Sequence, residues 1–257
     1  MSSPRAYKTR AIVLRARNLG EADKIFTLLT DARGKLDAIA KGVRRAKSHV
    51  AGRLEFASEA FLTMHCGRNL DVIASADIVR SRFASVVDPG AFATAHLLVE
   101  LVDAFCEHDL AVPEIYALLG GALGALPSTE DPASLVPRFE LRLLAELGVA
   151  PSSASCVRCD APLGATAAWV DYDAGGLTCE NCRPRRADAF ELSPEDVANF
   201  QGLGAERGGA VRPVLSAAAP VARAVDGFVN YQLGKRPKSK PLLDELSHRP
   251  SAASEVP

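Results

Sequence analysis

The sequence predicts an α+β fold in which a block of short strands precedes a mainly helical remainder. Apolar and polar residues alternate over five short runs before residue 83, and apolar residues recur at helical spacing from Ala91 onward. Four cysteines stand in two matched pairs between helical stretches. With 257 residues, 48% of them hydrophobic, the chain is long enough for one large domain or for two to three small ones.

The strand-forming runs are the first element of this prediction, and they cover 10–17, 23–30, 35–41, 59–66 and 70–76. Turn residues such as Asp31-Ala-Arg-Gly34 separate them. Five short strands with tight turns predict a small closed barrel, for which the five-stranded OB-fold is the most common architecture. Phe26 and Phe61 lie in apolar runs, so we expect both rings in the barrel core.

Helices follow the barrel. Apolar spacing and helix start and stop residues predict them over 92–105, 115–123, 138–147, from Ser193 onward, and over 213–233. The resulting division has a barrel at 1–83, a helical domain at 84–150 and 190–246, a cysteine module inserted at 151–189, and a disordered tail at 247–257.

The four cysteines are Cys156, Cys159, Cys179 and Cys182, and their spacing is C-x2-C-x19-C-x2-C. Each two-residue spacer lets one tight turn aim two sulfurs at a single ion, so the pattern is typical of zinc. Because four thiolates leave no open coordination position, we expect one structural Zn²⁺ ion. Two disulfides, four unrelated thiols and a redox pair are the alternatives.

The residues around these cysteines are consistent with that interpretation. Residues 169–177 alternate and end in a Gly175-Gly176 turn, which predicts a hairpin between the two pairs. Cys66 and Cys106 stand alone in apolar surroundings, so we expect both in the core. The first 17 residues contain no secretory signal pattern and no run of 18 apolar residues occurs, so we expect a cytoplasmic protein without a membrane span.

Charge is distributed unevenly along the chain. Residues 1–83 carry 16 Lys and Arg against 8 Asp and Glu, whereas residues 84–257 carry 14 against 23, giving the overall net charge of −1. Such asymmetry suggests a polyanion-binding module joined to an acidic or neutral body, although a soluble domain that happens to be basic is the alternative. The stretch 41–49 is the most basic, and Lys and Arg in such a loop can neutralise nucleic-acid phosphates. A merely solvated loop is the alternative.

In several segments the sequence resembles the RecO family of bacterial recombination mediators. They are Glu21-Ala-Asp-Lys-Ile-Phe26, Gly34-Lys-Leu-Asp-Ala-Ile-Ala-Lys-Gly-Val-Arg-Arg45, Arg138-Phe-Glu-Leu-Arg-Leu-Leu144, the four cysteines and Leu233-Gly-Lys-Arg-Pro-Lys-Ser-Lys240. The resemblance covers nearly the whole chain. It implies an N-terminal OB-fold barrel, an α-helical domain with a four-cysteine zinc-binding insertion, and a nucleoid-associated role in repair of DNA damage by the RecFOR pathway.

The resemblance also implies an activity without catalysis. Members of the family bind single- and double-stranded DNA, anneal complementary strands and, with RecR, help load RecA. We expect backbone contacts from Lys8, Lys24, Lys35, Lys41, Arg44, Arg45, Lys47 and Arg53. Arg138 and Phe139 match a helix that receives the C-terminal tail of the single-stranded-DNA-binding protein, although plain surface and core roles remain open for them.

No catalytic set stands out in the sequence, which contains neither a phosphate loop nor a dinucleotide fingerprint. Two other classes of function remain as alternatives. One is a zinc-dependent nucleic-acid enzyme, which would need an open metal position. The other is a protein-interaction scaffold whose basic N-terminal part meets an acidic partner.

Overall fold

The computed structural model describes residues 6–45, 48, 50–81, 88–164, 166–186, 189–205 and 217–247. The chain divides into two compact units, Met1–Ser128 and Thr129–Pro257. None of the helices within the described residues combines the length and apolar character needed to cross a membrane.

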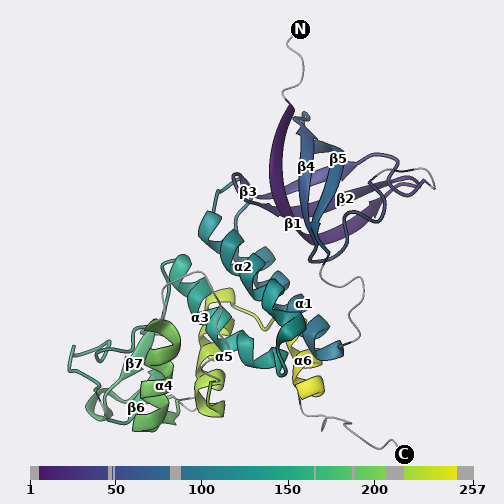
Figure 1. Cartoon of the computed structure of the whole chain (residues 1–257). Coiled ribbons are helices and arrows are strands. Elements are labelled where there is room, and N and C mark those ends of the chain that lie inside the picture. The colour runs from purple at the N-terminus through teal and green to yellow at the C-terminus, as the bar shows by residue number, and fades with distance from the viewer. Residues whose placement is uncertain are drawn as a thin grey trace, which may run out of the picture. The chain divides into compact units, whose positions relative to one another are not determined.

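The first unit contains the predicted barrel. Its strands are β1 (Ala6–Leu19), β2 (Asp23–Thr30), β3 (Gly34–Ala40), β4 (Glu59–His65) and β5 (Asp71–Arg80). They close in the order β1-β2-β3-β5-β4, with β3 and β5 parallel and the other pairs antiparallel (Figure 1). The five-stranded OB-fold prediction is therefore confirmed.

Along β2, β3 and β4 every second residue fills the barrel interior, for example Phe26 and Leu28 on β2 and Leu62 and Met64 on β4. Residues 11–14 of β1 are buried without alternation. A register shift between Val13 and Arg15 interrupts the pairing with β2 there. Both faces of β1 are consequently covered at this point, which a simple two-residue period does not predict.

Two helices, α1 (Pro89–Phe105) and α2 (Pro113–Ala125), belong to the same unit as the barrel, followed by the short η1 (Leu126–Ser128). The Asp88 carboxylate caps α1 by accepting from the Gly90 and Ala91 amides. On the outer face of the sheet, Glu59 of β4 accepts a hydrogen bond from the Tyr116 hydroxyl of α2 at 2.9 Å. The helices therefore cover part of the outer barrel surface as well as continuing the chain.

The second unit is built on α3 (Val136–Glu146), which packs against α4 (Pro194–Ala205) and α5 (Ala219–Leu233). The short η2 (Pro132–Leu135) precedes α3, and α6 (Lys240–Ser247) follows α5. Sequence patterning did not predict α6. The predicted helix over 213–233 is confirmed from Ala219 onward, while 206–216 and the predicted tail beyond Ser247 lie outside the described residues.

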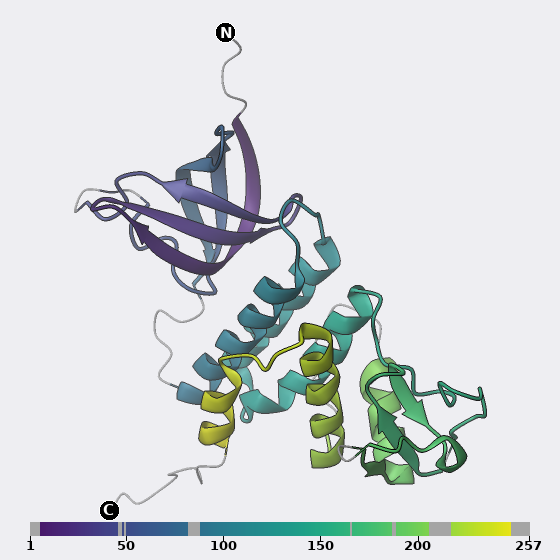
Figure 2. The ribbon, with the colours of Figure 1, turned by 180° about the vertical axis from the view of Figure 1, so that it is seen from behind.

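Between α3 and α4 the chain forms a small β-module. β6 (Ala168–Asp171) and β7 (Gly176–Thr178) make the predicted hairpin, and β8 (Glu191–Leu192) pairs with the other edge of β6. The turn requires Gly175, whose φ of 73° is left-handed. A side chain on Gly176 would meet the Ser152 carbonyl oxygen at 2.3 Å, so glycine is also needed there. Figure 2 shows α4 beside this hairpin.

The two isolated cysteines, Cys66 and Cys106, differ in burial. Cys106 is buried as predicted, at the C-terminal end of α1, where burial raises the pKa of its thiol to about 11. The prediction for Cys66 is wrong, because Cys66 follows the last residue of β4 and is exposed. The apolar run that suggested burial ends with the strand.

Candidate metal centre and nucleic-acid interface

The four paired cysteines come together in the second unit. Their sulfurs all lie within 4.8 Å of one another. The Cys159 and Cys179 sulfurs are 3.7 Å apart, far longer than a disulfide bond of about 2 Å. A tetrahedral ion with metal–sulfur distances of about 2.3 Å would separate its ligands by about 3.8 Å. The cluster therefore has the geometry to hold one metal ion through four thiolates.

Short backbone turns position these sulfurs. The Asp160 amide donates to the Cys156 carbonyl at 2.9 Å, and the Cys182 amide donates to the Cys179 carbonyl at 3.0 Å. The Val157 amide also donates to the Leu177 carbonyl at 3.0 Å, which ties the first turn to β7. The predicted hairpin therefore brings the two C-x-x-C turns together.

The electrostatics of Cys156 favour the thiolate that a metal requires. Burial of its sulfur opposes ionisation, but backbone N–H groups of Cys179, Arg158 and Cys159 donate toward it. These bonds outweigh burial and lower the pKa of the Cys156 thiol. Hydrogen bonds among the sulfurs raise the pKa of the Cys182 thiol, so the ligand role of the four cysteines rests on the short distances between their sulfurs.

Charged and aromatic side chains brace the module around the sulfurs. Two nitrogens of Arg158, Nε and Nη2, contact Oδ2 of the buried Asp171 carboxylate at 2.8 and 2.6 Å. The Trp169 indole donates to Glu180 at 2.7 Å, and the Arg183 guanidinium lies 3.7 Å from the centre of the Trp169 ring. These contacts link both C-x-x-C turns to β6.

In the first unit, four of the predicted phosphate contacts gather at one end of the barrel. Two hydrogen bonds join the start of β2 and the turn before it to the loop after β3. The Gly42 amide donates to the Asp23 carboxylate at 2.7 Å, and the Arg44 amide donates to the Ala22 carbonyl at 2.9 Å. The gathered residues are Lys24, Lys41, Arg44 and Arg45, which we call the basic end. Lys41, Arg44 and Arg45 are exposed, and Lys24 is half-buried beside them.

Two other predicted contacts, Lys8 and Arg53, lie on a different surface. Lys8 projects from β1 next to β4, and Arg53 forms an ion pair with Asp77 of β5 at 3.0 Å. Both side chains are exposed. The structure thus divides the predicted set between the basic end and the outer face of β1, β4 and β5. Lys47 lies outside the described residues.

Lys35 does not belong to either surface, which corrects its assignment as a phosphate contact. Only 6% of the residue is exposed. Its ammonium donates to the carbonyl oxygen of Asp103 in α1 and lies 3.4 Å from the carboxylate of the same residue. Lys35 points outward from β3, where α1 covers it. Its charge therefore helps to hold α1 against the barrel.

Phe61 is a second correction, because 38% of the residue is exposed instead of being in the core. The sequence contained the signal for this. Ala60, Leu62 and Met64 form the interior face of β4, so strict alternation directs Phe61 outward. The prediction was wrong because it relied on the apolar character of the run and not on which face of the strand Phe61 occupies.

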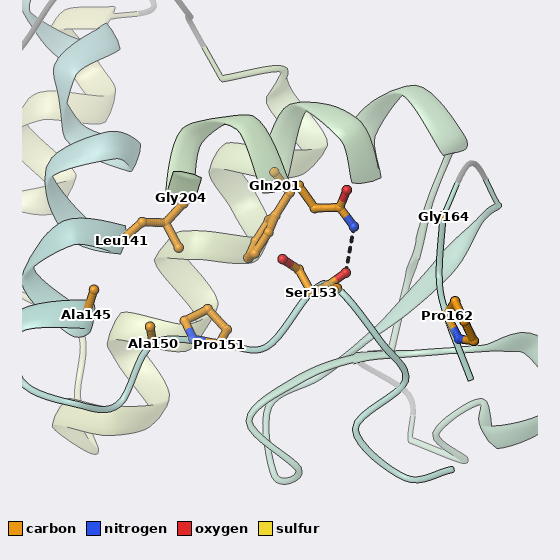
Figure 3. Close-up of a pocket in the computed structure, with 11 residues that line it drawn as sticks. Leu141, Ala145, Ala150, Pro151, Ser153, Pro162, Gly164, Gln201 and Gly204 are labelled. Carbon is orange, nitrogen blue, oxygen red and sulfur yellow. Dashed lines mark hydrogen bonds between the residues drawn. The ribbon is translucent and has the colours of Figure 1, made fainter. Parts of the chain in front are cut away.

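The two predicted partner-binding residues, Arg138 and Phe139, are buried in α3, with 4% and 2% of each residue exposed. A partner tail cannot reach them directly in this conformation. A cavity of about 540 Å³ lies farther along α3, and Figure 3 shows Leu141 and Ala145 on its α3 side and Gln201 on its α4 side. Gln201 closes part of its wall by donating to the Ser153 carbonyl at 2.7 Å.

Comparison with known proteins places both units in one family. Residues 1–91 match the model of the Recombination protein O N-terminal domain, and residues 87–241 match that of the Recombination protein O C-terminal domain. DNA repair protein RecO of Bifidobacterium longum, strains DJO10A and NCC 2705, is 35% identical over 248 residues, which cover 93% of this chain and 98% of the relative. The chain therefore belongs to the RecO family of DNA repair proteins.

Proposed function

We propose that this protein is a non-enzymatic recombination mediator that binds single- and double-stranded DNA and anneals complementary strands. It acts with RecR to help load RecA onto DNA coated by the single-stranded-DNA-binding protein. The observation that carries the DNA-binding part is the basic end, where Lys41, Arg44 and Arg45 are exposed around two hydrogen-bonded loops of an OB-fold. Loops at one end of this fold are a common place for oligonucleotides.

Annealing in this proposal requires no covalent step. Each Lys or Arg that neutralises a phosphate releases counterions, and bound strands repel one another less. Two complementary strands held on the same basic surface are concentrated, so their bases pair faster. Gly42, with a φ of 65°, keeps the start of the loop free of a side chain where a phosphate backbone approaches.

In this proposal the cysteine cluster holds one Zn²⁺ ion with a structural role. Four thiolates complete the tetrahedral coordination that zinc prefers, leaving no position for a water or a substrate. This donor set therefore favours a mediator over a zinc-dependent nucleic-acid enzyme. The ion would stabilise a module whose strands, with two to four residues each, cannot bury a core of their own.

The α3 helix remains our proposed docking element for the tail of the single-stranded-DNA-binding protein, but at a different place from Arg138 and Phe139. The cavity beside Leu141 and Ala145 is accessible and mostly apolar, with Phe200 of α4 on its opposite wall. An apolar terminal residue of a tail would fit such a cavity better than a position within the helix core.

The decisive experiment measures annealing of two labelled complementary oligonucleotides across a salt series. We expect the protein to accelerate annealing strongly at low salt and progressively less as salt rises. Replacing Arg44 and Arg45 together with Ala should weaken binding to single strands and make the salt slope shallower by about 1.4, since each lost contact contributes about 0.7.

The matched control is the double variant Arg185→Ala, Lys235→Ala, which removes two exposed charges from the other unit. It should retain the slope of the unmodified protein. If the protein neither anneals nor binds DNA, the scaffold alternative takes precedence. If it binds DNA and the basic-end variant has an unchanged slope, DNA contacts must lie elsewhere.

A further inference from the structure

The outer face of β1, β4 and β5 carries an exposed aromatic ring between cationic side chains. Phe61 of β4 is paired in register with Arg10 of β1 on one side and with Asp77 of β5 on the other. Lys8 projects from the same face of β1 two residues away, opposite Thr63. We call Phe61, Lys8, Arg10, Asp77 and Arg53 the Phe61 face.

The charge of this face is positive despite the acid beside the ring. The carboxylate of Asp77 is paired with Arg53 at 3.0 Å, and Arg53 also donates to the Ala76 carbonyl at 2.9 Å. Lys8 and Arg10 are both exposed. A polyanion approaching Phe61 therefore meets two cations on β1 and an acid that already has a partner.

Along the strands, the side of the ring away from Glu59 carries short side chains. On the Phe61 side of the sheet, the pair next along the strands is Thr63 with Ser75, whose side chains are short. Cross-strand neighbours of this kind leave a ring accessible, whereas large apolar neighbours would cover it. The barrel core does not require Phe61, because Ala60, Leu62 and Met64 supply the interior residues of β4.

The alternative sheet face is less available. OB-folds commonly bind oligonucleotides across strands 2 and 3. Here the outward residue Lys35 of β3 is buried and is held by Asp103 of α1. On β4 the contact of Glu59 with Tyr116 of α2 lies two residues from Phe61, and it leaves 38% of Phe61 exposed.

We infer that the Phe61 face is a binding site for single-stranded nucleic acid, in which the Phe61 ring stacks on an unpaired base. Lys8 and Arg10 contact flanking phosphates, and their Cα atoms are about 7 Å apart along β1. A base within a duplex is already stacked on both sides, so only an unpaired base offers its face to the ring. The inference rests on the proposed DNA-binding function and adds to it a residue that distinguishes single strands from duplexes.

The test compares equilibrium binding of a labelled oligothymidylate and of a duplex of the same length. Phe61→Ala should weaken binding to the single strand by about fivefold to 150-fold, the range found when a stacked aromatic is removed. The salt slope should stay unchanged, because stacking releases no counterions. Duplex affinity should also stay unchanged.

Three further variants make the test specific. Phe61→Leu keeps apolar volume without an aromatic face and should bind the single strand weakly, whereas Phe61→Trp should bind normally. Emission from the new indole should be quenched by oligothymidylate beyond any change of Trp169, the one native tryptophan. Phe92→Ala, which removes a ring of similar exposure from α1, should bind like the unmodified protein.

The outcomes separate this inference from the proposed function. If Phe61→Ala binds single strands normally while the Arg44 and Arg45 double variant is impaired, the stacking site is wrong and the proposed function stands. If both variants bind normally, neither DNA surface is correct. Equal weakening on single strands and duplexes, or loss of binding to RecR with DNA affinity retained, would also overturn the stacking role.

Discussion

The ammonium of Lys35 lies 2.5 Å from the carbonyl oxygen of Asp103 and 3.4 Å from the carboxylate of the same residue. Asp103 also pairs with Arg15 of β1 at 3.0 Å, so one acidic residue of α1 joins two strands of the barrel. These contacts explain why a lysine occupies a covered position on β3. They also make Lys35 a structural residue, in contrast to the exposed side chains of the predicted set, which are Lys8, Lys41, Arg44, Arg45 and Arg53.

We expect Lys35→Met to lower the free energy of unfolding by about 1–3 kcal/mol, because it removes the partner of partly buried polar groups on Asp103. The salt slope of DNA binding should remain unchanged. Urea denaturation and fluorescence anisotropy measure the two properties. Lys41→Met is the matched control at an exposed position and should show the reverse pattern, with normal stability and a shallower slope. A shallower slope for Lys35→Met with normal stability would return it to the DNA surface.

Local patterning predicted much of the architecture. The run 23–30 coincides with β2, since its turn residues and apolar alternation lie within the segment itself. The cysteine spacing likewise indicated the metal cluster, because a C-x-x-C turn is defined by its own four residues. Both features need little information from the rest of the chain.

Features that depend on contacts between distant elements were not predictable in the same way. The burial of Lys35 depends on α1, which begins more than fifty residues later. Arg138 and Phe139 are buried because α3 is packed by α4 and α5, so consecutive residues of α3 have lost contact with solvent. The exposure of Phe61, by contrast, could be predicted from the sequence, because the alternation along 59–65 places it on the outer face. The core prediction gave too much weight to its hydrophobic side chain.

The metal cluster leads to a second prediction. Replacing Cys179 with Ser should remove the bound metal and destabilise the module, because a serine hydroxyl is not ionised at neutral pH and three thiolates bind less tightly. Metal content by atomic emission and thermal unfolding of the second unit measure the two effects. Cys66→Ser is the control, because Cys66 is exposed and lies outside the cluster. A Cys179→Ser protein with full metal content and unchanged stability would contradict the four-thiolate site.

Glu140 of α3 is buried between the other helices of its unit, and neither of its carboxylate oxygens has a hydrogen-bond partner among the described residues. Burial is the main cause that raises the pKa of its carboxyl to about 8. Lys240 of α6 opposes the rise, whereas Asp226 of α5 and Asp244 of α6 add to it. Lys240 is itself paired with Asp226 at 3.0 Å, which limits its ability to neutralise Glu140.

This carboxyl should make stability depend on pH. Because its folded pKa of about 8 exceeds its ordinary value of 4.5, the folded protein binds a proton that the unfolded chain releases between those values. Its contribution to stability is therefore complete below pH 4.5 and declines as the pH rises toward 8, by up to about 1.4 kcal/mol per pH unit.

Glu140→Gln should remove this dependence, because an amide of similar shape cannot ionise. Urea denaturation at a series of pH values should give similar stabilities for the two proteins near pH 4.5. The variant should become progressively more stable than the unmodified protein up to pH 8, because only the unmodified protein must take up a proton on this side chain when it folds. Glu146→Gln, at an exposed position near the end of the same helix, should follow the unmodified protein throughout. Parallel curves for Glu140→Gln and the unmodified protein would mean that Glu140 is ionised in the fold, and that Lys240 stabilises its charge more than burial opposes it.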